Sequence, residues 1–558
     1  MTTDDSRPNV LCFVMDQLRY DHVSPSGNSL VQTPNIQSLA ASGISFERAY
    51  VNNPLCMPQR ATLFTGRMPR DHGVRTNGIP LGDDVATLPA ALSDAGYRTH
   101  AIGKLHLGLY TLPLEDIASL LHHGELSLSD FPDRFEPVLT AALEELAESE
   151  LTLTELPDPE EYPEAAVLWD KGVAGEFPTP YHGLDSVEFT GGHTDGIFGE
   201  YKRWLAEARP DAFERLPRDH LDNTPGMTPQ AFDWSLPADA HYNRWISDRA
   251  RAFLRDRSDQ ADPFFLWCSF PDPHHPYAAP EPWGSMYDPD EVSLPTRRAG
   301  ELDDLPPFYR EVVENSDVEL SGLHTNTDLN DDQIREIIAT TYGMVSFVDH
   351  EIGRVMEALS EEGLDEDALV VFLSDHGDMM GDHWTIRKGP FHFEGLLRIP
   401  MIWRWPGTIP EGERTDGLAS TVDFAPTVLD YCGVSNPSES DHFFPDDLIY
   451  EPPACQGQSL RRQIQGETEA VHDHVIVEND EDYLGLRVRS YITEEYKLTI
   501  YPGEEYGELF DLANDPEELH NRWDDPDYAT VKNRLTAEVL SDYVLQDGAI
   551  PRRMSHIG

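Results

Sequence analysis

Continuous apolar runs separated by polar segments are the main pattern along this chain, and they predict buried β-strands. Residues Asn9–Met15 and Ala368–Ser374 are runs of aliphatic and aromatic residues with almost no polar interruption. Such runs are typical of strands that are buried on both faces of a parallel or mixed sheet. Shorter apolar runs predict further strands over Tyr97–Gly103, Pro263–Phe270 and Ile399–Trp403. We therefore expect one large sheet whose two faces are covered.

Helical periodicity is strongest between Asp331 and Leu359, where apolar residues recur at spacings of three and four. This spacing predicts a long amphipathic helix. A second helix is expected over Ala238–Asp256, and a short one is expected to start at a Thr33 cap and to end at Ala41. Helices and strands that alternate in this way predict an α/β fold in which helices flank a large mixed sheet.

The end of the chain has a different pattern from the rest. Strand-like segments at Val475–Val477, Leu486–Arg489 and Lys497–Ile500 predict a small antiparallel sheet with a terminal helix. We therefore divide the 558 residues into a large α/β domain, 1–470, and a small α+β subdomain, 471–558. Within the large domain, residues of about 110–235 are rich in acidic blocks and prolines, and we expect them to form an insertion on the sheet edge that shapes a binding pocket.

The charge of the chain excludes several classes of partner. The sequence has 41 Lys and Arg residues against 101 Asp and Glu residues, a formal net charge of −60, and only six of the basic residues are lysine. So negative a protein would be repelled by nucleic acid and by anionic membrane surfaces. An acidic, lysine-poor surface instead predicts a halophilic protein, with an ordinary acidic protein as the alternative.

The start of the chain and the cysteines indicate the cellular setting. The first residues lack the apolar segment of a signal peptide, and no apolar run reaches the length of about 20 residues that spans a membrane. Five scattered cysteines match neither a disulfide framework nor a zinc site. We expect a cytoplasmic protein with no nucleic-acid and no membrane partner.

Side chains with oxygen and nitrogen donors follow the two longest apolar runs. Asp16 and Gln17 come directly after the first run, and Asp375 and His376 come directly after the second. Open α/β sheets bind their ligands at the carboxyl ends of the strands, so these side chains should meet if the two strands are neighbours. Two carboxylates, an amide oxygen and an imidazole predict an oxygen-rich site for a divalent cation. A turn-capping role for the carboxylates is the alternative.

A cysteine at a predicted helix start is the clearest candidate nucleophile. Cys56 follows a bend at Pro54, and Gly66 is a natural end for the helix. The free N–H groups of a helix N-terminus stabilise a negative charge, and Arg60 lies one turn further on. Read alone, a cysteine in this position is a structural or merely reactive residue as readily as a nucleophile.

Several short motifs resemble those of one enzyme family. Residues 56–67, with Cys56, Pro58 and Arg60 followed by Thr65-Gly66-Arg67, resemble the sulfatase signature C-x-P-x-R and its T-G-R tail. Residues 103–108 resemble the family's G-K-x-H-x-G, residues 273–277 its P-H-x-P-Y, and residues 381–388 the stretch that ends in its second active-site lysine. The sequence is identified as a member of the formylglycine-dependent sulfatases, in the alkaline-phosphatase-like superfamily. The resemblance implies an alkaline-phosphatase-like fold and covers nearly the whole chain except the expected insertion.

The resemblance also implies the site of a sulfuric ester hydrolase of the arylsulfatase type. Cys56 would be converted to formylglycine, whose hydrate attacks sulfur while a divalent cation and lysines hold the sulfate oxygens. We expect Ca²⁺ first. His376 stands where many sulfatases have Asn, and its nitrogen ligand shifts the preference toward softer ions such as Mn²⁺, so Mn²⁺ or Mg²⁺ are the alternatives. The implied metal ligands are Asp16, Gln17, Asp375, His376 and an oxygen of modified Cys56; the implied catalytic residues are Cys56, Arg60, Lys104, His106, His274 and Lys388; Asn77 and His193 are candidates for substrate contact.

Each implied catalytic residue has a role in this scheme. Lys104 and His106 would hold or deprotonate the hydrate, and Arg60 would orient it. His274 and Lys388 would bind the sulfate and protonate the leaving alcohol. The expected partners are a small-molecule sulfate ester and a formylglycine-generating enzyme that acts on the cysteine motif, and a homo-oligomer is compatible with the sequence.

Other functions remain open at this point. A phosphonate monoester or phosphodiester hydrolase uses the same nucleophile and metal, and Gln17 with His376 resembles that branch too. A non-catalytic binding protein with an unmodified Cys56 is an alternative from another class. A phosphatase or phosphomutase fits less well, because those relatives have Ser or Thr at the nucleophile. Aryl, sugar and choline sulfate esters are all compatible with the sequence.

Overall fold

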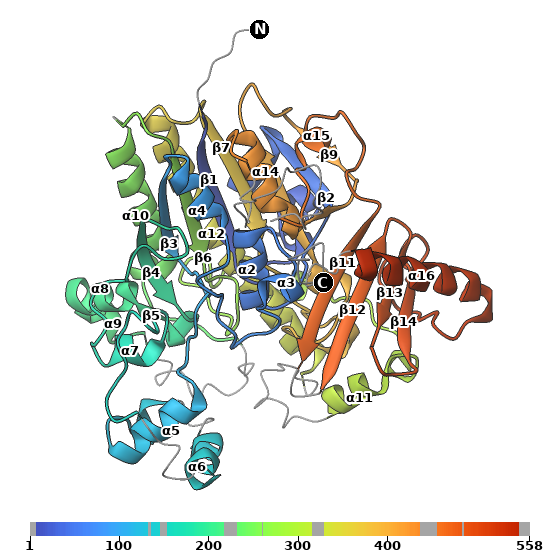
Figure 1. The fold of residues 1–558 in the computed structure, drawn as a ribbon, viewed down its shortest axis with the longest axis horizontal. Helices are drawn as coiled ribbons and strands as arrows, with labels where there is room; N and C mark the ends of the chain where they lie inside the picture. Colours follow the sequence, from blue (N-terminus) through green and yellow to red (C-terminus); the bar gives the residue numbers. More distant parts are fainter. Residues whose placement is uncertain are drawn as a thin grey trace, which may run out of the picture.

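The structure is a computed structural model, and it describes residues 7–131, 136–145, 153–216, 231–258, 260–314, 329–435, 455–481 and 485–545. It contains a large mixed sheet between layers of helices and a separate small antiparallel sheet (Figure 1). The predicted α/β fold is therefore confirmed, with helices that flank the large sheet and a smaller antiparallel sheet near the C-terminus.

The large sheet consists, in the described residues, of β1 (Asn9–Met15), β2 (Ile44–Tyr50), β3 (Arg98–Gly103), β4 (Ser186–Gly191), β5 (Phe198–Gly199), β6 (Phe264–Phe270), β7 (Ala368–Ser374), β8 (Arg398–Arg404), β9 (Glu413–Thr415) and β10 (Ala419–Ser420). Their order is β10-β2-β8-β7-β1-β6-β3-β4-β5, and β9 pairs with β2. β1 runs parallel to both of its neighbours, β6 and β7. β8 is antiparallel to β7 and to β2, so the sheet is mixed.

The register around β1 sets the position of the residues that follow it. Met15, the last residue of β1, is opposite Phe270 in β6 and Ser374 in β7. The three strands therefore end at the same level, and the residues after them meet at one edge of the sheet, as expected for neighbouring parallel strands. We call this the level edge.

Alternate residues of β1 belong to two different hydrophobic cores, because successive side chains of a strand point to opposite faces. The even-numbered residues from Val10 to Val14 pack with residues of α2 (Cys56–Thr65), α4 (Leu88–Asp94) and α14 (Phe424–Tyr431). The odd-numbered residues from Leu11 to Met15 pack with residues of α1 (Pro34–Ala41), α10 (Tyr242–Arg257) and α12 (Asp331–Glu361). Burial on both faces explains the uninterrupted apolar sequence of this strand.

The start of α1 differs from the sequence prediction. Thr33 precedes the helix, but its hydroxyl group donates to Oγ of Ser24 (2.9 Å) and makes no capping bond. The cap is Asp349 of α12, whose Oδ1 accepts the N–H groups of Asn35 (3.0 Å) and Ile36 (2.8 Å). A carboxylate from a neighbouring helix thus replaces the local cap and ties α1 to α12.

The small sheet is formed by β11 (His474–Glu481), β12 (Leu486–Thr493), β13 (Tyr496–Ile500) and β14 (Gly507–Asp511), which are antiparallel throughout. α16 (Ala529–Leu545) covers one face, where Leu535 and Val539 pack with Ile476, Leu498 and Leu509. The predicted sheet and terminal helix are therefore present. The division of the chain at residue 470 stays a prediction.

The expected insertion at about 110–235 contains sheet structure that the sequence did not indicate. β4 pairs in parallel with β3, and β5 pairs antiparallel with β4, so both strands extend the large sheet. Five helices complete the described part of this region: α5 (Leu114–His123), α6 (Glu136–Glu145), α7 (Ala166–Asp170), α8 (Glu200–Ala208) and α9 (Pro210–Phe213). Residues 132–135, 146–152 and 217–230 of the region lie outside the described residues.

The remaining α-helices are short and connect the larger elements. They are α3 (Pro69–His72), α11 (Pro307–Glu314), α13 (Glu394–Leu397) and α15 (Arg461–Ile464). Among the helices that the structure describes, none combines the length and the apolar composition needed to cross a membrane.

Candidate active site

The candidate site lies at the level edge, where β1 and β7 end. Asp16 and Gln17 follow β1, Asp375 and His376 follow β7, and all four side chains are buried. The backbone N–H of Gln17 donates to Oδ1 of Asp375 (3.0 Å), which joins the two strand ends directly. Gln17 has a φ of 67°, a left-handed conformation that is uncommon for a non-glycine residue. The structure thus brings together three of the side chains that were predicted to bind a cation, those of Asp16, Asp375 and His376, and joins Gln17 to them through its backbone.

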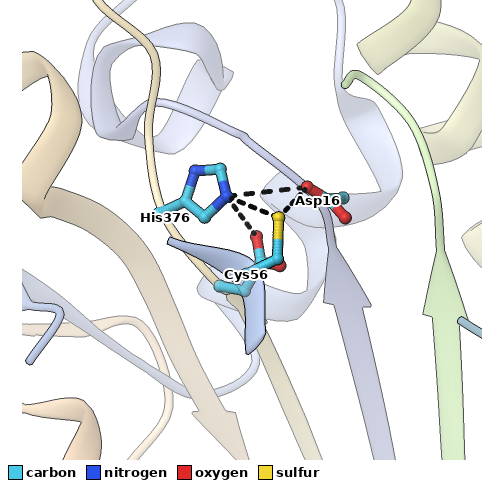
Figure 2. A group of neighbouring side chains, drawn as sticks. Asp16, Cys56 and His376 are labelled. Carbon is cyan, nitrogen blue, oxygen red and sulfur yellow. Dashed lines mark hydrogen bonds and ion pairs between the residues drawn. The ribbon is translucent and has the colours of Figure 1, made fainter. Parts of the chain in front are cut away.

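Cys56 is the first residue of α2, and it is 1% exposed. Its Sγ lies 3.2 Å from Nε2 of His376 and 3.8 Å from Oδ1 of Asp16, as Figure 2 shows. Nζ of Lys388 lies 2.7 Å from the same sulfur atom. Burial raises the pKa of the Cys56 thiol, but the ammonium groups of Lys104 and Lys388 contribute to a net lowering. The surroundings of the sulfur therefore favour a negative charge.

The start of α2 is held by an asparagine from a later segment. Leu55 precedes the helix and makes no capping bond with its side chain, whereas Oδ1 of Asn77 accepts the N–H of Met57 (3.1 Å). Asn77 is exposed, and its predicted contact with substrate stays a prediction. At the other end, Gly66 terminates the helix in a left-handed conformation with a φ of 65°, as expected.

Arg60 of α2 is fully buried and connects several strand ends. Its Nε donates to Oδ2 of Asp375 (2.8 Å), and its Nη2 donates to Oδ2 of Asp16 (3.3 Å). Its Nη1 donates to the carbonyl oxygen of Lys104 and to Oγ of Ser269, at 3.0 Å each. Burial opposes the charge, but Asp375 and Asp16 outweigh it and raise the pKa of Arg60. The guanidinium group therefore joins the ends of β1, β3, β6 and β7, and its predicted role in orienting the nucleophile stays a prediction.

Lys104 follows β3 and reaches the same edge. Gly103 before it has a φ of 99°, and a Cβ atom there would lie 1.9 Å from the carbonyl oxygen of Ser269, so only glycine fits. Beyond this close approach, Nζ of Lys104 contacts a carboxylate oxygen of Asp16 and lies 2.7 Å from Nε2 of His193. Lys104 and His193, which were predicted as site residues from different parts of the chain, are therefore in direct contact.

The imidazoles of His274 and His376 both present Nε2 to the site. Nδ1 of His274 donates to the backbone oxygen of His275 (2.6 Å), and Nδ1 of His376 donates to that of Gly377 (2.9 Å). Each Nε2 lies 3.1 Å from Nζ of Lys388. Burial is the main cause that lowers the pKa of His274, so its neutral form is favoured.

His106 lies beside this cluster and is held by residues of the expected insertion and its border. Its ring stacks on that of Tyr110, with the centroids 3.8 Å apart. Its backbone N–H donates to Oε2 of Glu164 (2.7 Å), and the same carboxylate accepts the N–H groups of Leu107 and Gly108. In the described residues, Nδ1 of His106 has no hydrogen-bond partner, and burial lowers the pKa of the ring. The predicted role of His106 in handling the nucleophile stays a prediction.

Some residues that shape the site were not predicted from the sequence. Nε2 of Gln17 lies 2.5 Å from Oδ2 of Asp378 and 3.1 Å from Nδ1 of His275, and Tyr277 donates its hydroxyl hydrogen to the same oxygen of Asp378 (2.7 Å). Asp378 belongs to the polar segment that follows β7, so its position was a usable signal. Glu164 has no comparable signal, because nothing near it in the sequence marks it as buried.

The cluster at the level edge fits a divalent cation. Ligand atoms of Asp16, Cys56, Asp375 and His376 lie within 4.8 Å of one another. Oε1 of Gln17 is buried and has no hydrogen-bond partner among the described residues. A buried amide oxygen without a partner, on the residue that follows Asp16, adds to a donor set suited to a cation that prefers oxygen ligands.

Comparisons with known proteins agree with this geometry. The family model "Sulfatase" matches residues 8–113 and 201–434, and the model "N-sulphoglucosamine sulphohydrolase, C-terminal" matches residues 381–544. An arylsulfatase of Clostridium perfringens is 28% identical over 540 residues, which cover 94% of this chain and 91% of that protein. The multifunctional alkaline phosphatase superfamily protein PehA of Trinickia caryophylli is 25% identical over 572 residues, which cover 96% of this chain and 95% of that protein. The crystal structure of a phosphonate monoester hydrolase of Agrobacterium radiobacter is similar with a TM-score of 0.72 and 25% identity, over 97% of this chain and 96% of that one.

The matched residues include most of the candidate site. Cys56, Lys104, His274 and Asp375 lie in the segments matched by the "Sulfatase" model, whereas His193 lies between those segments. The resemblance inferred from the motifs and the alkaline-phosphatase-like fold are both confirmed. With more than half of its residues matched, this chain belongs to the sulfatase family of sulfuric ester hydrolases.

Proposed function

We propose that this sulfatase hydrolyses the sulfate ester of an organic alcohol or phenol, with a formylglycine made from Cys56 as the nucleophile. The observation that carries the proposal is the convergence of Lys388, His376 and Asp16 on one sulfur atom at a helix N-terminus. In the modified residue the oxygens of the aldehyde hydrate would take the place of Sγ, so the contacts of Sγ stand in for those of the nucleophile. Nearby ammonium and imidazole groups favour the deprotonated form of such a nucleophile.

One divalent cation would be held by Asp16, Gln17, Asp375 and His376, together with an oxygen of the modified Cys56. Oxygen donors dominate this set, so Ca²⁺ is the first choice, and Mn²⁺ or Mg²⁺ are the alternatives. When bound, such a cation acts as a Lewis acid that withdraws charge from the sulfate oxygens.

The basic groups of the chain would bind the anionic part of the substrate. The ammonium groups of Lys104 and Lys388 are held by Asp16 and by imidazole nitrogens, and they would balance the charge that develops on the sulfate oxygens. Lys388 and His274, 3.1 Å apart, would pass a proton to the departing alcohol oxygen. Lys104 would hold the attacking hydroxyl group, and His106 would take its proton.

Phosphonate monoester or phosphodiester hydrolysis is the second candidate. Gln17 and His376 add an amide and an imidazole to the cation site, and a phosphonate monoester hydrolase is similar in structure over 97% of this chain. The same kind of nucleophile and cation act on phosphorus as well as on sulfur. Turnover of 4-nitrophenyl sulfate and of a 4-nitrophenyl phosphonate monoester distinguishes the two, and a large excess for the phosphonate would reverse our order.

The modification is tested by mass spectrometry of the peptide that contains Cys56, taken from protein made in its native host. We expect the aldehyde in place of the thiol. An active enzyme with an unmodified thiol would refute the formylglycine mechanism. A protein that keeps the thiol and turns over neither ester would instead be a binding protein.

The setting of the enzyme is part of the same proposal. A formylglycine-generating enzyme would act on the Cys56 motif, and the mature enzyme would work in the cytoplasm of a salt-adapted cell, as the net charge of −60 suggests. The salt adaptation is tested by unfolding midpoints at low and multimolar KCl. Equal midpoints in the two solutions would refute it.

A further inference from the structure

His193 comes from the stretch that the "Sulfatase" model leaves unmatched, yet it lies inside the candidate active site. It follows β4, which runs parallel to β3 with Gly103 opposite Phe189. Because the two strands end at the same edge, residues after β4 reach the position of Lys104, which follows β3. The side chain of His193 is 19% exposed, whereas that of Asp16 beside it is 0% exposed, so His193 lies on the more open side of the site.

The imidazole of His193 contacts two of the proposed catalytic groups at once. Its Nε2 lies 2.7 Å from Nζ of Lys104, which also contacts Asp16. Its face stacks on the ring of His274, with centroids 3.5 Å apart and an interplanar angle of 6°. The ring of His275 continues the stack on the other side, at 4.1 Å from that of His274. His193 therefore restricts the movement of both Lys104 and His274.

The hydrogen-bond roles in this group follow from its chemistry. An ammonium group only donates, so Nε2 of His193 accepts from Lys104 and the imidazole is neutral. Without the ring, the ammonium group of Lys104 would lose one of its two nearest acceptors. One face of His274 would also lose its stacking partner.

We propose that His193 is a positioning residue that holds Lys104 toward the sulfate group and His274 toward the leaving alcohol. This inference rests on the proposed function, because it gives His193 a place in that same site. His193 acts through its two neighbours, which differs from the direct substrate contact that the sequence predicted. The expected insertion thus supplies part of the catalytic machinery.

A second cation is the main alternative use of these residues. Ligand atoms of Asp16, His193 and His274 lie within 4.8 Å of one another, a spacing that a metal ion accepts. However, the two Nε2 atoms already face ammonium groups, that of Lys104 at 2.7 Å and that of Lys388 at 3.1 Å. A cation bound by Asp16 and His193 would take both acceptors that now hold Lys104, whereas the proposed cation at Asp16 and His376 leaves His193 to this lysine. The geometry therefore favours the positioning of lysines over metal binding.

Misplacement of His274 would have a recognisable kinetic signature. As the S–O bond to the alcohol breaks, its electron pair goes to the alcohol oxygen, and a proton from the Lys388–His274 pair neutralises that oxygen. Basic leaving groups depend on this proton more than acidic phenols do. Loss of the stacking partner should therefore slow esters of weakly acidic phenols most, which a general loss of stability would not do.

Three substitutions of His193 separate its two contacts. His193→Phe keeps a ring against His274 and removes the acceptor for Lys104, His193→Gln keeps an acceptor and removes the ring, and His193→Ala removes both. His123→Ala, on an exposed residue of α5 in the same region, is the matched control. We would measure kcat and KM for aryl sulfates whose phenols cover a range of acidities, together with thermal unfolding midpoints.

We expect His193→Ala to lower kcat about 100-fold for the least acidic phenol, with a change in KM of less than about threefold, because misplaced groups lower kcat. The loss should shrink as the phenol becomes more acidic. His193→Phe should restore the wild-type dependence on the leaving group, and His123→Ala should behave as the wild type. Equal losses for all phenols, or a loss confined to KM, would overturn the proposal.

Further measurements separate this proposal from the proposed function. Turnover of 4-nitrophenyl sulfate by the wild type tests the function, and if phosphonate monoesters are preferred, the same variants are compared on a series of those esters. A crystal structure of His193→Ala should show the His274 ring turned or in several orientations, and an unchanged ring would refute the proposal. A second equivalent of metal in the wild type that is lost from His193→Ala would also refute it, because His193 would then be a metal ligand.

Discussion

The two halves of the site are built on different kinds of backbone. Asp16, Asp375 and Lys104 follow neighbouring strands, so the hydrogen bonds of the sheet set their positions. Lys388 instead ends a loop, residues 379–388, in which the structure describes neither a strand nor an α-helix. We call these the strand-borne half and the loop-borne half.

The loop-borne half is held in place by backbone hydrogen bonds within the loop and by the side chain of Asp378. Oδ1 of Asp378 accepts the N–H groups of Met380 (2.9 Å) and Arg387 (2.7 Å), near the two ends of the loop. Met380, His383, Trp384 and Arg387 all have left-handed φ values, between 46° and 66°. Each such non-glycine residue costs about 1–3 kcal/mol, so the loop keeps a strained shape that depends on its hydrogen bonds. Among them, the N–H of Met379 donates to the backbone oxygen of Arg387 (2.8 Å) and joins the two ends of the loop.

This difference indicates where substitutions should affect stability and where they should affect activity. A strand end cannot move without breaking hydrogen bonds of the sheet, so changes there should affect folding and catalysis together. The loop takes no part in the sheet, so it can lose its shape while the sheet stays folded. Changes in the loop-borne half should therefore reduce activity far more than stability.

The largest effect is expected where the two halves meet, at Cys56. Cys56→Ala removes the proposed nucleophile and should lower kcat by at least about 10⁴-fold. The unfolding midpoint should change little, because only one sulfur atom is lost. Steady-state kinetics with the preferred ester and thermal unfolding measure the two effects. Cys432→Ala, at another buried cysteine, should keep turnover, and an active Cys56→Ala enzyme would contradict the assignment.

Asp375→Asn tests the strand-borne half. It removes a proposed cation ligand and weakens a buried ion pair with Arg60, whose Nε lies 2.8 Å from the carboxylate. Breaking a buried pair costs about 3–5 kcal/mol. We therefore expect a clear loss of stability in urea unfolding together with a fall in kcat of about 10³-fold. Asp367→Asn, at the exposed residue before β7, is the control. An Asp375→Asn protein as stable as the wild type would contradict the expected link between stability and activity in the strand-borne half.

Asp378→Ala tests the loop-borne half. It frees the N–H groups of Met380 and Arg387, so the loop should hold Lys388 less firmly against Cys56. It also removes the acceptor of the Gln17 amide and of the Tyr277 hydroxyl group. We expect kcat to fall about 100-fold, while the free energy of unfolding falls by only about 1–3 kcal/mol.

Asp378→Asn is the matched variant, because it keeps an acceptor oxygen at the same place and should recover part of the activity. Kinetics and urea unfolding are measured side by side for both variants. The contrast between the two halves would fail if Asp378→Ala lost as much stability as Asp375→Asn and kept its kcat.

The smallest effect is expected in the helix layer behind β1, at Asp349. Burial raises the pKa of this carboxyl group to about 6, above its ordinary value of about 4. The folded state therefore binds the proton more tightly than the unfolded state, and stability rises as the pH falls through 6 and levels off below about 4. Relative to Asp349→Asn, the wild type should gain about 1 kcal/mol of unfolding free energy between pH 7 and pH 5, with no change in kcat. Parallel pH profiles of the two proteins would contradict the raised pKa.

The strand-borne half could be predicted from the sequence because its signals are local. The bounds of β1 and β7 agree with the two long apolar runs, and the polar residues after them meet as expected for level parallel strands. The long helix also begins at the predicted residue, Asp331. Strands that are buried on both faces have a continuous apolar sequence, and this pattern can be recognised from the sequence alone.

The loop-borne half could not be predicted in this way. Met, Trp and Arg do not favour the left-handed conformation, so these residue types did not predict the shape of residues 379–388. Lys388 was assigned only through the family resemblance. Glu164 and His193 reach the site through β4 and its surroundings, and β4 has six residues with no long apolar run. Contacts between distant segments, such as that of Asp349 with α1, cannot be predicted from local sequence patterns either.

The contacts of Arg60 have a consequence for the protein without its cation. Its guanidinium group pairs with Asp375 and Asp16, so the two carboxylates have a counter-charge that belongs to the chain itself. We therefore expect the ion-free protein to remain folded and to accept a new ion. Different divalent metals can then be exchanged by dialysis in a single preparation and ranked directly by the activity that each restores.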